Sequence, residues 1–356
     1  MKIIRLTTLH GYGGQEKKLI NFTEIPELLN NEYVFAAIGH GGHAEKLLRE
    51  RGFKVKIFNL PIAHKNILNV IKIAKWLREE KPEVVHTAAS EANFHGVLAA
   101  KLAGVPYIIA EEIGVPNTHS KLAQFIFRLV YKFANKVIAV SEEVKRVLIL
   151  QKEAPESKIE VLYNLVPFPQ IQSVEKSEEF KWVMVSRLIP RKNTSTLLKA
   201  FSRLDKNRRG SLDIIGDGPE LQNLKKMVKD LNLSDSVNFY GFQPKPEKFI
   251  SKANVFVLPA FDEGFGIVVI EAMSLKVPCL CGYGGGIPEY ISHNDNGWFF
   301  DPSSTDDLFE KMNYLLDKDL EYIENMGNKA FKSVINRFSI ENYVRNLENI
   351  YAEKLN

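Results

Sequence analysis

Residues 255–274 read VFVLPAFDEGFGIVVIEAMS. The run at 255–258 is short and apolar, as is typical of a buried strand. Gly264 and Gly266 then interrupt the chain, and residues 266–274 return to an apolar pattern that predicts a helix. The order strand, turn and helix predicts one βα unit of a parallel sheet, with its loop at the carboxyl end of the strand.

The same alternation extends outward over most of the chain. Amphipathic segments at 67–78, 121–133, 194–203 and 219–231 predict helices between short β-rich runs. Such alternation predicts an α/β fold with two doubly wound parallel sheets, each covered by helices on both faces. The predicted strands are residues 3–8, 33–38, 54–59, 84–87, 107–110, 136–140, 181–186, 211–215, 237–240, 255–258 and 278–281.

The length of 356 residues indicates two domains, because a single core rarely grows past about 250–300 residues. Pro167 and Pro169, followed by a polar run, predict an exposed linker over residues 164–180. We therefore expect domains at 1–166 and 167–338. A final helix, residues 339–356, would follow with Ser339 as its N-cap.

The composition is that of an ordinary globular protein, with 45% hydrophobic and 25% charged residues and a net charge of +4. The charge is uneven: residues 1–166 hold 23 Lys and Arg against 17 Glu and no Asp. A basic half favours an anionic partner such as a phosphate or a lipid head group, although an ordinary solvated surface explains it as well. The sequence has no block of Lys and Arg of the kind that indicates nucleic-acid binding.

The two cysteines, Cys279 and Cys281, are spaced so that they point to opposite faces of a strand. This spacing argues against a disulfide or a metal pair and fits a reducing cytoplasm. The first residues lack the apolar run of a signal peptide, and no stretch of about 18 apolar residues predicts a membrane span. We therefore expect a cytoplasmic protein.

Several loops that follow predicted strands carry residues suited to a ligand. Arg187 and Lys192 flank a loop that leads into a helix, an arrangement that suits a pyrophosphate, or a solvated loop. Glu263 and Glu271 bracket the turn at Gly264 and Gly266, and both could point into one cleft.

Glycine-rich turns follow two other predicted strands. Gly13 and Gly14 let the backbone approach a ligand, or form a plain tight turn. Glu16 stands where a dinucleotide fingerprint needs glycine. The consecutive glycines 284–286 would cost stability unless the backbone there needs a close approach or a positive φ.

Taken together these motifs resemble the retaining glycosyltransferases of family 4. Glu263 and Glu271 reproduce the E-x7-E signature, within LPAFDEGFGIVVIEAM. VSRLIPRKN, IIGDGPE, VIAVSEEVK, VLYN, GGIPEYI and Asn296-Gly297 are also similar to the family in order and spacing. The resemblance covers nearly the whole chain and is strongest over residues 180–300.

The resemblance implies a GT-B fold: two facing Rossmann-like domains with the active site in the cleft between them. The second domain would bind a nucleotide-sugar donor and the first the acceptor, and the final helix would cross back onto the first domain. Arg187 and Lys192 look like the donor diphosphate clamp, Glu271 like the ribose ligand and Glu263 like the residue that meets the hexose.

Two positions depart from the family pattern. Glu112 stands where many members have a histidine that touches the donor sugar, and it would either replace that histidine or bind the acceptor. Asn193 stands where many members have glycine, and asparagine tolerates the left-handed turn. The catalytic residues so implied are Glu263, Arg187, Lys192 and Glu112. The donor-binding residues are Gly13, Gly14, Arg187, Lys192, Phe242, Glu263, Gly264, Phe265, Gly266, Ile267 and Glu271.

The implied reaction moves a hexose or N-acetylhexosamine, with retention, to a glycan or lipid-linked acceptor in polysaccharide or glycoconjugate biosynthesis. Family frequency alone favours a UDP-sugar. We expect no cofactor and no required metal. The alternatives are an epimerase or phosphorylase on the same fold, or a non-catalytic two-lobed sugar-binding protein.

Residues 120–136 are basic and amphipathic. They predict either a core-packed helix or a peripheral contact with the cytoplasmic face of an anionic membrane.

Overall fold

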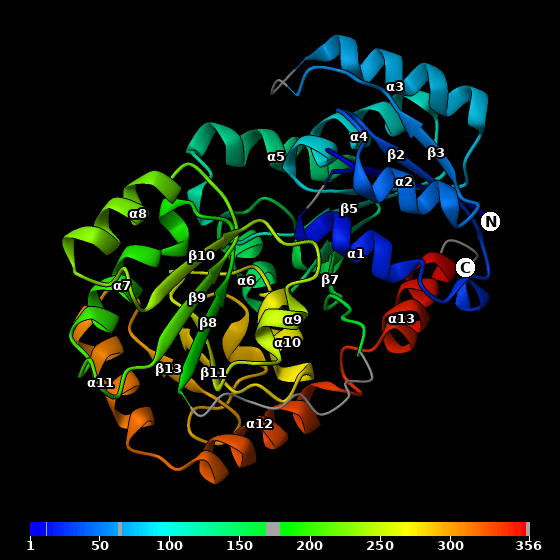
Figure 1. Cartoon of the computed structure of the whole chain (residues 1–356). Helices are drawn as coiled ribbons and strands as arrows, with labels where there is room; N and C mark the ends of the chain where they lie inside the picture. Colours follow the sequence, from blue (N-terminus) through cyan, green and yellow to red (C-terminus); the bar gives the residue numbers. More distant parts are fainter. Residues whose placement is uncertain (12, 63–65, 169–178, 354–356) are drawn as a thin grey trace. The chain divides into compact units, whose positions relative to one another are not determined.

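The structure, a computed structural model, describes residues 1–11, 13–62, 66–168 and 179–353. The chain divides into two compact units, one formed by Met1–Val166 with Phe338–Asn356 and the other by Pro167–Arg337 (Figure 1). Most of the predicted linker, residues 169–178, lies outside the described residues. Its predicted start at Asn164 is wrong, because Leu165 and Val166 are fully buried, and Leu165 belongs to the core of the first unit.

The first unit contains a parallel sheet of seven strands within the described residues, in the order β3-β2-β1-β4-β5-β6-β7. The order reverses at β1, so the sheet is doubly wound and the strands on both sides of β1 end at the same edge. The strands are β1 (Lys2–Thr7), β2 (Glu32–Ala37), β3 (Lys54–Ile57), β4 (Val84–Ala88), β5 (Tyr107–Glu112), β6 (Lys136–Ala139) and β7 (Ile159–Val161).

Helices cover both faces of this sheet. Three neighbours, α3, α4 and α5, pack side by side in that order, while α1 and α2 share the other face's core with α13. The helices are α1 (Gly14–Phe22), α2 (His43–Glu50), α3 (Ile67–Glu80), α4 (Ser90–Ala103), α5 (Lys121–Phe133), α6 (Glu142–Leu150) and α13 (Ile340–Ala352).

Helix α13 closes over a buried cluster of charges in the first unit. Glu111 accepts a hydrogen bond from the Lys18 ammonium and lies 3.5 Å from the Arg5 guanidinium. Burial opposes ionisation of Glu111, but Lys18, His86 and Arg5 together outweigh it and hold its pKa below the usual range. His86 Nδ1 lies 2.7 Å from the Tyr351 hydroxyl, which ties α13 to the sheet beside these charges.

The second unit repeats the topology with six described strands, in the order β10-β9-β8-β11-β12-β13. The strands are β8 (Lys181–Val185), β9 (Ser211–Ile215), β10 (Val237–Gly241), β11 (Val255–Leu258), β12 (Cys279–Gly282) and β13 (Trp298–Phe300). The helices are α7 (Thr194–Ser202), α8 (Leu221–Asp230), α9 (Glu247–Ile250), α10 (Ile267–Ser274), α11 (Thr305–Leu316) and α12 (Leu320–Val334).

The predicted α/β class is therefore confirmed, and all the predicted strands are present. Two further strands, β7 and β13, were not predicted, because each has only three residues and carries no periodic signal. Cys279 and Cys281 both lie in β12 as free, buried thiols.

Replacing Leu347 by alanine tests whether α13 stabilises the first unit. Leu347 is fully buried in the core that joins α13 to α1 and α2. The cavity should lower the unfolding free energy of the first unit by about 2–5 kcal/mol. Hydrogen exchange should show faster exchange in β1 and β2 and unchanged exchange in β8 and β9. Arg345→Ala, on the surface of the same helix, should change neither, and equal loss in both units would contradict this view of α13.

Candidate functional site

The loops after β8 and β11 form the richest group of polar residues in the second unit. These strands are neighbours and run parallel, so their loops leave the same edge of the sheet. The two loops are also joined directly, because the Phe261 amide donates to the Arg191 carbonyl at 3.2 Å.

Two ion pairs connect these loops. The Lys192 ammonium donates a hydrogen bond to the Glu263 carboxylate, and the Arg191 guanidinium pairs with Asp262. The side chains of Lys192 and Glu263 are mostly buried, at 18% and 15% exposure. The structure therefore brings two of the predicted catalytic residues into contact.

Arg187 lies on the same loop as Lys192, but its side chain is exposed. Its guanidinium has no ion-pair or hydrogen-bond partner among the residues that the structure describes. An arginine without a carboxylate partner keeps its donors available for an anion such as a phosphate.

Asn193 ends the short 3-10 turn that carries Lys192. It adopts the left-handed conformation, with φ of 55°, and its side-chain amide donates to the Pro302 carbonyl at 2.8 Å. The prediction that asparagine can replace glycine in this turn is confirmed.

The glycines after β12 hold the loop that carries Glu263. A Cβ at Gly284 would lie 2.3 Å from the Phe261 carbonyl oxygen, and one at Gly285 would lie 1.9 Å from that of Glu263. Gly285 also has a φ of 64°, and the Gly286 amide donates to the Glu263 carbonyl at 2.9 Å. Both conditions expected of consecutive glycines, close approach and positive φ, are met here.

Helix α10 begins after Gly266, which has a φ of 81°. Glu271 lies on this helix and is 5% exposed. Phe265 is also buried, and its carbonyl accepts a hydrogen bond of 2.7 Å from the Tyr290 hydroxyl. Of the predicted donor residues in this segment, Gly264, Phe265 and Gly266 are buried and Ile267 is half-buried. The Phe265 side chain is thus part of the protein's own packing, and the backbone of this segment remains the part suited to a ligand.

Phe242 lies apart from these residues. It follows β10, which is separated from β8 by β9, and half of its side chain is exposed.

The turn at Gly216 and Gly218 packs against the loop that carries Arg187. A Cβ at Gly216 would lie 1.8 Å from the Ser186 carbonyl oxygen, and one at Gly218 would lie 2.3 Å from that of Leu188. This turn therefore supports the loop that carries Arg187.

In the first unit, Gly13 and Gly14 lie at the start of α1, directly after the turn that follows β1. The loop after β2 lies against this turn, because a Cβ at Gly42 would be 3.1 Å from Gly11 Cα. The His10 amide donates to the His40 carbonyl at 3.2 Å and joins the same two loops.

His10 is a candidate that the sequence reasoning missed. Its side chain is fully buried, and neither ring nitrogen has a hydrogen-bond partner within the described part of the chain. Burial and the nearby Arg49 lower its pKa to about 4, so the imidazole is neutral near pH 7. A buried neutral imidazole has one donor and one acceptor to satisfy. The only signal for this candidate in the sequence was a histidine placed between a predicted strand and a glycine turn.

Glu112 lies at the carboxyl end of β5 and is 3% exposed. Burial raises its pKa to about 7, although the Tyr131 hydroxyl donates to its carboxylate at 2.9 Å. His119 and Glu153, 2.8 Å apart, lie near enough to influence it. Glu112 and Glu111 are consecutive in one strand, so they occupy opposite faces of the sheet.

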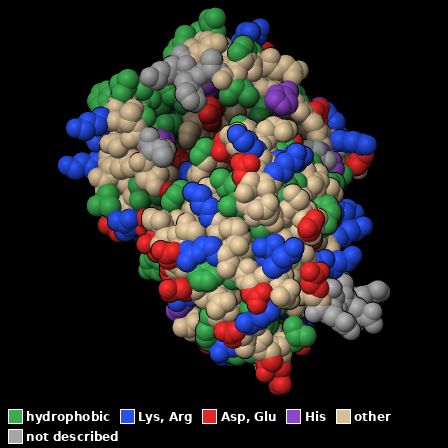
Figure 2. Space-filling model, turned by 60° about the vertical axis from the view of Figure 1, so that its left-hand side comes forward, with side chains coloured by type: hydrophobic (Ala, Val, Ile, Leu, Met, Phe, Trp, Pro, Cys, Tyr) green, Lys and Arg blue, Asp and Glu red, His purple; other side chains and the backbone are tan. Residues whose placement is uncertain are grey.

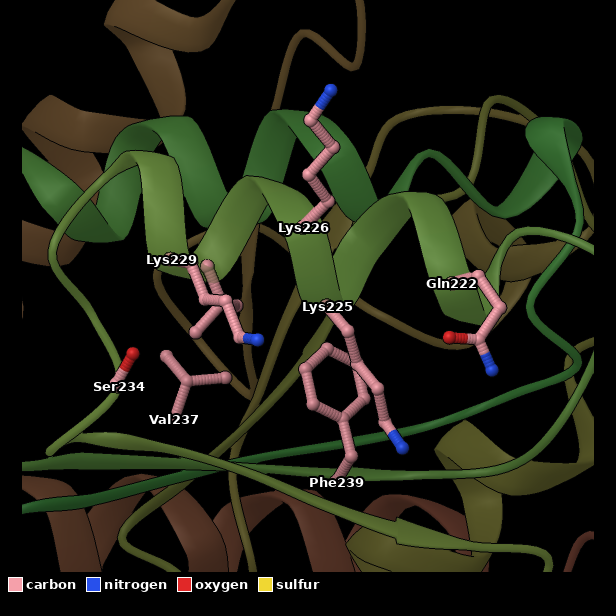
Figure 3. Close-up of a pocket in the computed structure, with 8 residues that line it drawn as sticks. Gln222, Lys225, Lys226, Lys229, Ser234, Val237 and Phe239 are labelled. Carbon is pink, nitrogen blue, oxygen red and sulfur yellow. The ribbon is translucent and has the colours of Figure 1, made fainter.

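A hollow of about 410 Å³ lies in the second unit between α8 and the edge strand β10. Figure 3 shows the residues that line it. Lys225 and Lys229 extend toward Val237 and Phe239, while Lys226 points away. None of the predicted site residues lines this hollow. Across the described ranges, no group of three or more His, Cys, Asp or Glu is placed to hold a metal ion.

Comparison with known proteins identifies the family. Residues 169–333 match the family described as glycosyl transferases group 1, and residues 25–168 match glycosyltransferase family 4. The two matches run without a gap from residue 25 to residue 333. The chain belongs to this family of glycosyltransferases.

Relatives of known activity support the same family. The chain is 30% identical over 212 residues to N-acetyl-alpha-D-glucosaminyl L-malate synthase of Bacillus anthracis, covering 56% of this chain and 55% of that protein. It is 25% identical over 311 residues to UDP-Gal:alpha-D-GlcNAc-diphosphoundecaprenol alpha-1,3-galactosyltransferase of Escherichia coli, covering 81% and 80%. The first of these alignments thus spans only about half of the relative's length.

A solved structure supports the fold. The crystal structure of Anabaena HepE in complex with UDP and glucose has a TM-score of 0.87, with 20% identity, and covers 99% of this chain and 100% of that one. The predicted GT-B class, with two Rossmann-like parallel-sheet domains, is therefore confirmed.

Glu112→Gln tests the environment of this carboxyl group. Because its folded pKa of about 7 lies above the usual 4.5, the folded chain holds the proton more tightly, and Glu112 costs stability as the pH rises through this range. Glutamine cannot ionise. Between pH 5 and pH 8.5, the unfolding free energy of the variant should rise relative to that of the wild type by about 2 kcal/mol.

Denaturant unfolding at both pH values measures this difference. Glu50→Gln, on the surface of α2, should show no such change with pH. A difference for Glu112→Gln that stays constant over the whole range would contradict the burial described above.

Proposed function

We propose that the chain is a retaining glycosyltransferase that moves a hexose or N-acetylhexosamine from a UDP-sugar to a glycan or lipid-linked acceptor. The observation that carries the proposal is the joining of Lys192 and Glu263 on adjacent loops at the carboxyl edge of the second sheet. These are family-signature positions in a chain that belongs to the family. In this proposal the second unit, Pro167–Arg337, binds the donor and the first unit binds the acceptor.

Arg187 and Lys192 would bind the donor diphosphate. An exposed guanidinium and an ammonium at one loop provide two cations for the charge that grows on the leaving group. Lys192 is paired with Glu263, so the diphosphate would compete for its ammonium. Released in this way, the Glu263 carboxylate would accept hydrogen bonds from the hydroxyls of the transferred sugar.

Glu271 and the glycine loop would complete the donor site. A carboxylate on the first turns of α10 suits the two hydroxyls of a ribose. The loop at Gly264 and Gly266 would offer backbone amides to a phosphate, where the start of α10 adds its favourable dipole. Phe242 would contact the base from the loop after β10.

In the reaction, the bond between the anomeric carbon and the phosphate oxygen breaks and a bond from an acceptor hydroxyl oxygen to the same carbon forms. The acceptor attacks on the face from which the diphosphate leaves, so the configuration is retained. The acceptor proton passes to the departing phosphate oxygen, and charge and atoms balance without a cofactor. The first unit has no aspartate to serve as a nucleophile, which favours this direct route over a covalent aspartyl intermediate.

Glu112 and His10 would act on the acceptor side. Glu112 is buried against Tyr131, which suits a residue that positions its neighbours. His10 has a neutral imidazole that could bind an acceptor hydroxyl as both donor and acceptor.

Nucleotide binding tests the donor site. UDP, GDP, ADP, TDP and NAD are compared by thermal shift, and UDP should raise the melting temperature most. Arg187→Ala and Lys192→Ala should each weaken UDP binding about 10- to 100-fold, since each removes a charge-assisted hydrogen bond. Arg208→Ala, which removes an exposed arginine of the same unit, is the matched control.

Two outcomes would overturn the donor proposal. A shift with NAD alone would indicate a different enzyme class. Sugar transfer that survives in both Glu263→Ala and Lys192→Ala would show that the site is assigned to the wrong residues.

His10→Phe separates acceptor binding from donor binding. The substitution keeps the ring and removes both nitrogens, so KM for the acceptor should rise about tenfold or more while UDP binding is unchanged. Steady-state kinetics with varied acceptor measures the first quantity, and calorimetry measures the second. Loss of UDP affinity with an unchanged acceptor KM would refute the role given to His10.

A further inference from the structure

Helix α5 carries apolar side chains on two different faces. Phe127, Val130 and Tyr131 are buried against the first unit. Leu122, Phe125, Leu129 and Phe133, spaced three or four residues apart, form a second stripe that faces solvent. Leu122 is 61% exposed and Phe125 53%, so the protein's own core does not account for this stripe.

Exposed apolar side chains also occur on the two helices next to α5. The order of packing is α3, α4, α5, so these three helices form one layer over one face of the sheet. Ile67, Leu68 and Ile71 on α3 are more than half exposed, as is Leu102 at the end of α4. Figure 2 shows hydrophobic side chains gathered on the surface of the first unit at the top of the view. We call this layer the α3–α5 face.

The charge of the α3–α5 face is strongly positive. The three helices carry seven Lys and Arg against three Glu, and α5 has Lys121, Arg128 and Lys132 with no carboxylate. One of the three glutamates, Glu80, is already bound by Lys2 and Lys54. An exposed apolar stripe flanked by cations is the pattern of a helix that lies in the interface of an anionic bilayer.

We propose that the α3–α5 face docks on the surface of an anionic lipid bilayer, with the apolar stripe of α5 inserted at the head-group level. The charge argues against a second copy of this chain as the occupant, because two such faces would bring like charges together. The contact is peripheral: in the described ranges, no helix has the length and apolar character needed to cross a bilayer.

The docked face would deliver a lipid-linked acceptor to the first unit. Helix α5 starts a short loop after Glu112, so its first turn lies at the edge where β5 ends. Docking through α5 would bring that edge to the membrane, where the head group of a lipid-linked sugar lies. This step rests on the proposed function, but binding to the bilayer does not.

Vesicle co-sedimentation of the full chain tests the proposal. The wild type should bind vesicles of phosphatidylcholine mixed with phosphatidylglycerol at least tenfold better than pure phosphatidylcholine. Binding should weaken in about 0.5 M sodium chloride, because screening shortens the electrostatic attraction. Phe125→Gln with Leu129→Gln should lower binding at least tenfold, and Lys121→Glu with Lys132→Glu should remove the preference for anionic lipid.

Leu150→Gln is the matched control, since Leu150 is 63% exposed at the end of α6, outside the α3–α5 face, and should bind vesicles like the wild type. Thermal shift with UDP should be unchanged in every variant. That separates a failed docking proposal from a failed transferase proposal.

Three results would overturn the docking proposal. The first is that the wild type binds neither kind of vesicle, and the second is that the variant with Phe125→Gln and Leu129→Gln binds as well as the wild type. Alternatively, sedimentation of the wild type without lipid could show a dimer that these substitutions disrupt, which would assign the face to a second copy of the chain.

Discussion

The backbone of residues 260–263 lies against that of residues 282–286 with no space for a side chain between them, and the candidate donor site depends on this contact. The contact fixes Glu263, because Gly286 donates to its carbonyl and Gly285 leaves room for it. The position of Glu263 in turn sets the partner of Lys192, one strand away. Any side chain larger than hydrogen at Gly284 or Gly285 would therefore disturb Glu263 and Lys192, which are distant in the sequence.

The charged side chains of the two units differ in how far they are buried. In the first, Arg5, Lys18 and Glu111 are buried together, and both cations pair with the one carboxylate inside the protein. In the second, Lys192 and Glu263 are partly open to solvent and Arg187 is exposed, so these charges can be exchanged with those of a ligand. A buried cluster of this kind serves the packing of α13, whereas partly exposed pairs on loops are typical of binding sites.

The sequence predicted the fold class well, because strands of four to six residues alternate with amphipathic helices and the loops between them are rich in glycine. It could not predict β7 or β13, which are too short to show a period. Nor could it predict the environment of Glu112, since Tyr131 reaches it from a helix that follows a separate loop. His10 was overlooked because its significance lies in buried nitrogens without partners, which only coordinates reveal. For α5, the sequence left a core-packed helix and a membrane contact open, and the structure shows a buried stripe and an exposed one on the same helix.

Helix α13 completes the core of the first unit, yet it is translated after every strand of the second. Until it arrives, the side chains of Phe22 and Tyr33 lack the cover that Tyr343 and Tyr351 provide. A nascent chain emerging from the ribosome must therefore carry an unfinished first unit while the second is synthesised and folds. The usual order, in which the amino-terminal domain finishes folding first, is reversed for the last step. This chain order would affect the dependence on chaperones during synthesis more than the stability of the mature protein.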